Sequence, residues 1–198
     1  MGILLVVLGY FLGAVPTGLI LVRLLTGVDL REYGSGQLGP TNVYRVAGPY
    51  VGAVVFLVDL LKGALPVLAA QRLGLAPAWA VAGGLASMAG HNWSVFLRFG
   101  GGRGVVTSFG VLLALSPWAA VVAGVVWGIV VALTRMITPA SVLALLSIPF
   151  TMLVLREPWE FVAFGVLAAA LGAYRHRGSL RRLVEDDGFG AVHRSKGR

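Results

Sequence analysis

Seven apolar runs alternate with short polar segments along the chain. The runs cover residues 2–25, 46–70, 78–99, 105–116, 117–133, 140–155 and 159–174. Because roughly 20 apolar residues cross a bilayer as a helix, the pattern predicts an all-α integral membrane protein, a polytopic bundle of about seven transmembrane helices. The fourth run has only 12 residues. It must borrow from the glycine-rich segment before it or stay partly re-entrant, so the number of full spans around residues 100–133 is open.

Composition supports a membrane protein and excludes a soluble one. Hydrophobic residues make up 58% of the 198 residues and charged residues 12%, against about 25% charged in soluble domains. Little chain remains for a large extramembrane domain, so we expect a single transmembrane domain over residues 1–184 and a polar, basic tail over 185–198. The absence of cysteine excludes disulfides, thiolate nucleophiles and cysteine-ligated metals.

Lysine and arginine are distributed unevenly between the two faces of the predicted bundle. Thirteen of the sixteen lie in or beside the 26–45 loop, the 98–104 loop, the 134–139 turn and the C-terminal tail, whereas Arg72 and Arg156 lie on the other face. Because positively charged loops stay in the cytoplasm, we expect the C-terminus inside and the N-terminus outside. The net charge of +8 points to anionic headgroups or phosphorylated substrates before nucleic acid, which is not an expected partner.

The loop before the second run has the composition of a phosphate site. Its glycines, Gly36 among them, let backbone N–H groups approach an anion. Ser35, Thr41 and Asn42 supply neutral donors. Arg45 supplies a cation that can bind a phosphate with two parallel hydrogen bonds. The alternative is a flexible turn whose Thr or Asn caps the second helix.

A second glycine-rich segment leads into the fourth run. Consecutive glycines followed by Arg and Gly at the start of an apolar helix favour anion binding, because the helix N-terminus carries partial positive charge. The spacing is not that of a Walker A loop. The candidates are His91, Gly101, Gly102, Arg103, Gly104 and Thr107. The alternatives are a histidine that caps a helix and an arginine that only anchors the cytoplasmic interface.

Two further polar features complete the set of candidates. His176 and Ser179 are three residues apart on a predicted helix and so share one face, although a basic stretch after the last span also suits anionic headgroups. Asp59 and Lys62 are spaced to meet inside the second span. An intramembrane ion pair is costly and indicates function, or an anchor for loops packed against it; the alternative is snorkelling of Lys62 to an interface.

Several enzyme classes lack their defining motifs here. There is no G-x-S-x-G elbow, no H-E-x-x-H and no His-x-x-x-x-Asp acyltransferase motif. What remains is a cationic, hydroxyl-rich and glycine-rich pocket beside lipid, which can catalyse by proximity and by stabilising phosphate or oxyanion charge. The natural substrates of such a site are phosphate-bearing and acylated.

Taken together, the ordered motifs resemble the bacterial acyl-phosphate:glycerol-3-phosphate acyltransferases, the PlsY family. They are Gly34-Ser35-Gly36-x-x-Gly39-x-Thr41-Asn42-x-x-Arg45, Asp59-x-x-Lys62-Gly63, Gly90-His91, Gly101-Gly102-Arg103-Gly104-Val105-x-Thr107, and His176-Arg177 followed by Arg182-Leu183. The resemblance implies a seven-helix enzyme that transfers a fatty acyl group from acyl phosphate to the 1-hydroxyl of sn-glycerol 3-phosphate, giving lysophosphatidic acid and phosphate in phospholipid biosynthesis. It also implies a bacterial cytoplasmic (inner) membrane location, a site facing the cytoplasm, and no metal or other cofactor.

The same resemblance nominates the site residues. Those implied as catalytic are Ser35, Arg45, Arg103 and His176. Those implied as binding substrate or phosphate are Gly36, Thr41, Asn42, Lys62, His91, Gly101, Gly102, Gly104, Thr107, Ser141 and Ser179. Deprotonation of the glycerol hydroxyl by a phosphate oxygen fits the lack of an obvious base. Membrane lipids are the expected surroundings, and a monomer is expected because no dimerisation motif stands out.

The chain also departs from the family pattern. Gln37, Pro40, Gly100 and Arg103 stand where the family usually has Asn, Ala and two Lys, and Ser179 stands where it has Asn. Two alternatives to the acyltransferase stay open. One is a transporter for an anionic solute, and the other is a catalytically impaired lipid-binding paralogue.

Overall fold

The computed structural model describes residues 1–185, most of which are helical. Its elements are α1 (Gly2–Ala14), α2 (Thr17–Thr26), η1 (Leu30–Glu32), α3 (Pro40–Arg72), α4 (Pro77–Asn92), η2 (Val95–Leu97), α5 (Val105–Leu115), α6 (Pro117–Thr134), α7 (Ile137–Val154) and α8 (Trp159–Glu185). Every predicted apolar run contains helix, and the described part of the chain has no strand, only an isolated bridge between Ser94 and Gly100. The predicted all-α fold is confirmed. Beyond Glu185, the expected tail lies outside the described residues.

Four stretches are long and apolar enough to cross a membrane. They are Gly2–Thr26, Pro40–Arg72, Pro117–Thr134 and Ile137–Val154. Helix α5 has only 11 residues, as the short fourth run predicts, and it follows the glycine-rich segment rather than extending through it. Large apolar side chains such as Leu8, Phe56, Val125 and Phe150 are exposed on the outside of the bundle, where a bilayer satisfies them.

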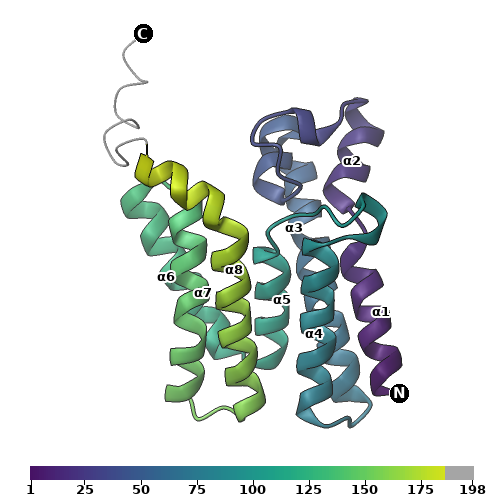
Figure 1. The fold of residues 1–198 in the computed structure, drawn as a ribbon, viewed down its shortest axis with the longest axis vertical. Coiled ribbons are helices and arrows are strands. Elements are labelled where there is room, and N and C mark those ends of the chain that lie inside the picture. The colour runs from purple at the N-terminus through teal and green to yellow at the C-terminus, as the bar shows by residue number, and fades with distance from the viewer. Residues whose placement is uncertain (186–198) are drawn as a thin grey trace.

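A break in the helix interrupts each of the first two spans. The first run splits into α1 and α2 at Pro16, which has no N–H to donate and keeps Val15 out of the helical conformation. Helix α3 begins at Pro40, earlier than the predicted start at residue 46, and bends at Gly48, whose φ of 86° is left-handed. The segment from α2 to this bend therefore forms a separate cap at one end of the bundle (Figure 1).

Glycines allow the helices to pack closely. Gly13 lets α1 pack closely against α4, because a Cβ atom at this position would overlap the backbone of Ser87. Gly63 likewise lets α3 pack closely against α5, because a Cβ atom there would overlap the carbonyl oxygen of Thr107. Small residues at such crossings let helix backbones approach, and close packing drives helix association where water cannot.

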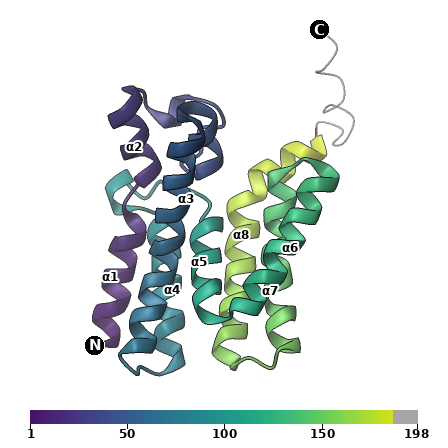
Figure 2. The ribbon, with the colours of Figure 1, turned by 180° about the vertical axis from the view of Figure 1, so that it is seen from behind.

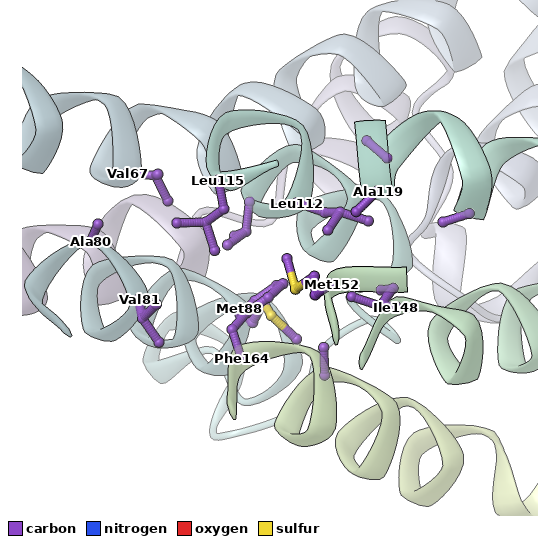
Figure 3. Packing of buried hydrophobic residues seen from close by; sticks show 14 of the residues in the cluster. Val67, Ala80, Val81, Met88, Leu112, Leu115, Ala119, Ile148, Met152 and Phe164 are labelled. Carbon is purple, nitrogen blue, oxygen red and sulfur yellow. The ribbon is translucent and has the colours of Figure 1, made fainter. Parts of the chain in front are cut away.

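The helices form two groups joined by a shared apolar core. Helices α6, α7 and α8 lie side by side on one flank and α1, α3 and α4 on the other, with α5 between them in both views (Figures 1 and 2). Met88 of α4, Leu112 of α5, Met152 of α7 and Phe164 of α8 meet in this core and are almost fully buried (Figure 3). Helix α5 thus fixes one group against the other just below the glycine-rich segment.

Candidate active site

The three polar segments singled out in the sequence meet at one cavity. Its volume is about 340 Å³, and its lining comes from the first loop, the glycine-rich segment and the end of α8. The lining residues are Gln37, Gly101, Arg103, Arg175, Arg177, Gly178 and Ser179. Segments more than 60 residues apart in the chain therefore contribute to a single polar hollow.

Arg103 connects three helices at this cavity. It lies two residues before α5, and its guanidinium donates to Thr138 Oγ1 of α7 at 3.3 Å and to Ser179 Oγ of α8 at 2.5 Å. It also lies 3.5 Å from Nδ1 of His176. Since His176 and Ser179 both meet Arg103, they share one face of α8, as their spacing predicts.

Arg175 is a site residue that the sequence analysis missed. Its guanidinium donates to the carbonyl oxygens of Gly101, at 3.0 Å, and Gly102, at 2.7 and 3.1 Å, and it lies 5.5 Å from the ring centre of Trp93. Arg175 thereby ties the glycine-rich segment to α8. Its signal in the sequence is its position four residues before Ser179, on the same helix face.

The glycine-rich segment is a tightly packed turn. The N–H of Gly102 donates to the carbonyl oxygen of His91 at 3.1 Å, and a Cβ on Gly102 would overlap the His91 ring. Gly104 has a φ of 72° and forms the N-cap of α5. Its Cα faces the buried side chain of Asn92, so only glycine fits there.

The loop between α2 and α3 takes its shape from Asn42. The Asn42 side chain is buried, its Oδ1 accepts from the N–H of Ser35 at 2.9 Å, and its Nδ2 donates to the carbonyl oxygens of Tyr33 and Gln37, each at 3.0 Å. The amide of Asn42 is thus used within the loop. Asn42 therefore holds the loop in shape and positions the backbone of Ser35, and its side chain does not line the cavity.

The exposed residues of this loop and of the first turns of α3 are the remaining candidates from the first segment. Ser35, Thr41 and Arg45 are exposed and Gly36 is half-buried. Thr41 and Arg45 are four residues apart on α3 and so share a face. At the start of the loop, hydrogen bonds from Arg31 lower the pKa of Asp29 to about 2.

Several nominated side chains do not line this cavity, and the buried His176, at 1% exposure, is one of them. Lys62, Thr107 and Ser141 are almost fully buried, and the His91 side chain is 11% exposed. Ser141 Oγ donates to the carbonyl oxygen of Ile137, within its own helix. Lys62 pairs with Asp59 inside α3, as their spacing predicts.

The cavity is cationic and lacks acidic side chains. Three arginines line it, and no Asp or Glu among the described residues does. Residues 1–185 also hold no cluster of three or more His, Cys, Asp or Glu side chains that could bind a metal ion. Such a lining binds phosphate groups and stabilises developing oxyanion charge, whereas it offers no activated nucleophile.

Comparison with known proteins decides the family. The model of the glycerol-3-phosphate acyltransferase family matches residues 3–186. The chain belongs to this family. It is 46% identical to the glycerol-3-phosphate acyltransferase of Myxococcus xanthus over 91% of this chain and 94% of the relative, and 44% identical to glycerol-3-phosphate acyltransferase 2 of Moorella thermoacetica over 93% and 94%.

Solved structures of a related acyltransferase have the same fold as this chain. The crystal structure of PlsY, an integral membrane glycerol 3-phosphate acyltransferase, in its glycerol 3-phosphate form superposes with a TM-score of 0.89 at 36% identity, covering 97% of each chain. The lysophosphatidic acid form of PlsY superposes with a TM-score of 0.87 at 35% identity, covering 93% of this chain and 92% of that one. The protein is thus an integral membrane glycerol-3-phosphate acyltransferase that serves phospholipid biosynthesis.

Proposed function

We propose that this acyltransferase takes its acyl group from an acyl phosphate and produces lysophosphatidic acid and inorganic phosphate. The observation that carries the proposal is the cavity lined by Arg103, Arg175 and Arg177, whose described lining includes no activated nucleophile and no Asp or Glu. Both substrates would then carry phosphate, one as the leaving group and one as the anchor of the acceptor. A cationic hollow suits an acyl phosphate, whose leaving group is itself a phosphate, better than a thioester, whose leaving group is a thiolate.

The step that fits this lining needs no covalent enzyme intermediate. The 1-hydroxyl oxygen of sn-glycerol 3-phosphate attacks the acyl carbon, the carbon–oxygen bond to phosphate breaks, and the released phosphate takes up the hydroxyl proton. Arg103 and Ser179 line the cavity and would stabilise the phosphate and the oxyanion, with His176 beside Arg103. Ser35, Thr41 and Arg45 would close the site from the loop side.

In this proposal the remaining nominated residues support the site. Gly101, Gly102 and Gly104 shape the backbone of the segment that carries Arg103, and Gly36 does the same for the loop that carries Ser35. Thr107 on α5 and Ser141 on α7 are almost fully buried. We further propose a monomer in the bacterial cytoplasmic membrane, with this end of the bundle facing the cytoplasm.

The donor is tested by measuring phosphate release from palmitoyl phosphate by the purified protein. We expect release that depends on sn-glycerol 3-phosphate, with lysophosphatidic acid as product, and no product when palmitoyl-CoA is the donor. Product formed only from palmitoyl-CoA would contradict the proposed donor. A folded protein that binds sn-glycerol 3-phosphate without making product from either donor would instead support the impaired paralogue.

Variants of the first loop test the site. We expect Arg45→Ala and Ser35→Ala each to lower kcat by about 100-fold or more, the usual cost of losing a donor to an oxyanion or phosphate. Arg72→Ala is the matched control, because Arg72 is an exposed arginine at the opposite end of α3. Wild-type kcat in both loop variants would contradict the assignment of the site.

A further inference from the structure

The break between α1 and α2 leaves carbonyl groups that need donors. Inside a bilayer such groups must be satisfied by the protein itself. Ser94 Oγ donates to the carbonyl oxygen of Ala14 at 2.5 Å. The carbonyl oxygen of Val15 accepts from the N–H of Thr17 at 3.0 Å and from Nζ of Lys62 at 2.6 Å. A lysine of α3 therefore stabilises the break in the first span.

Lys62 uses two of its three N–H donors within the protein at this position. Its ammonium also donates to Asp59 Oδ1 at 2.8 Å, and the two side chains are only 3% and 2% exposed. Lys62 does not line the cavity that holds Arg103 and Arg175. A phosphate in that cavity thus meets the arginines without contact to the lysine.

The ion pair continues toward the glycine-rich segment. Asp59 Oδ1 lies 3.9 Å from Nδ1 of His91, and the His91 carbonyl oxygen accepts from the N–H of Gly102 at 3.1 Å. Gly102 in turn packs on the His91 ring and accepts from Arg175 through its own carbonyl oxygen. An unbroken series of contacts runs from the break in the first span to the wall of the cavity.

We propose that Asp59 and Lys62 are positioning residues, which hold the break at Val15 and the glycine-rich segment in register and do not bind phosphate. The inference rests on the proposed function and deepens it, since it reassigns Lys62, nominated above as a phosphate ligand. It also accounts for a charge pair in a low-dielectric span, where an ion pair needs further hydrogen bonds to be retained. Val15 supplies that further acceptor.

The test compares two double variants that remove both charges and so avoid an unpaired buried ion. In D59N/K62Q the glutamine keeps an N–H donor for the carbonyl oxygen of Val15, on a side chain that is one bond shorter than that of lysine. In D59N/K62M the methionine has a similar size and no donor. We expect the glutamine variant to keep kcat within about tenfold of wild type and the methionine variant to lose about 100-fold, the usual cost of a misplaced site.

Binding measurements separate positioning from phosphate contact. We expect both double variants to keep wild-type Kd values for sn-glycerol 3-phosphate and for inorganic phosphate, measured by calorimetry on detergent-purified protein. Arg72→Gln serves as the control for the loss of a distant charge. A glutamine variant no more active than the methionine variant, or a Kd raised about 30-fold in both, would overturn the proposal, since loss of a direct phosphate contact costs binding.

Failure of this positioning proposal can be distinguished from failure of the proposed acyl-phosphate donor. If wild-type protein makes lysophosphatidic acid only from another donor, kcat of the variants is measured with that donor, and the two Kd values do not depend on it. The comparison of glutamine with methionine then still decides between positioning and ligation.

Discussion

At the scale of single residues, Arg103 and Ser179 depend on each other. The guanidinium of Arg103 reaches Ser179 Oγ at 2.5 Å and Thr138 Oγ1 at 3.3 Å. The resemblance places Lys and Asn at positions 103 and 179 in the family. A longer cation opposite a shorter hydroxyl spans the same gap as a shorter cation opposite a longer amide. We therefore expect the two departures to compensate for each other, which would argue against the impaired paralogue.

This compensation is tested by a double-mutant cycle. We expect Arg103→Lys and Ser179→Asn each to lower kcat by about tenfold or more, because one leaves a gap and the other crowds the guanidinium. The double variant R103K/S179N should recover most of the lost kcat. The check is kcat for all four proteins at saturating substrate. Effects that simply multiply would show that the two positions act independently.

At the scale of elements, some features could be predicted from the sequence and others could not. The apolar runs predicted the helices, since hydrophobic length dominates in a bilayer. The spacing of His176 and Ser179 predicted their shared face. The role of Arg175 could not be predicted, because it donates to backbone carbonyls of Gly101 and Gly102, and no side-chain pattern marks such an acceptor. The contact of Lys62 with the carbonyl oxygen of Val15 could not be predicted for a similar reason.

The crossing of α3 and α5 is an element whose packing should control the site. We expect Gly63→Ala to lower the free energy of unfolding by about 1–3 kcal/mol and also to lower kcat, because the added methyl group overlaps the Thr107 backbone and displaces the helix that follows Arg103. Thermal unfolding in detergent and the activity assay measure the two effects.

The control for this prediction lies on α6. A Cβ on Gly128 meets nothing within 4 Å, so Gly128→Ala should keep kcat and stabilise the helix slightly. Equal losses in Gly63→Ala and Gly128→Ala would show that the close crossing of α3 and α5 does not explain the result.

At the scale of the whole molecule, the cavity lies at the end of the bundle that carries most of the positive charge. Arg103, Arg175 and Arg177 line it, and all three are among the 13 Lys and Arg that the sequence assigns to the cytoplasmic face. The same arginines would thus orient the protein in the membrane and recruit phosphate-bearing substrates from the cytoplasm. Orientation and catalysis would then be linked through shared residues.

The natural absence of cysteine makes a test of this orientation simple, because any thiol introduced is the sole one in the chain. Glu32 is exposed beside the first loop, and Leu73 is exposed where α3 ends at the opposite end of the bundle. We expect Glu32→Cys to react with a membrane-impermeant maleimide in inside-out vesicles only. Leu73→Cys should react in right-side-out vesicles only. The reverse pattern would place the cavity outside the cell, away from cytoplasmic sn-glycerol 3-phosphate, and would contradict both the orientation and the proposed route of substrate to the site.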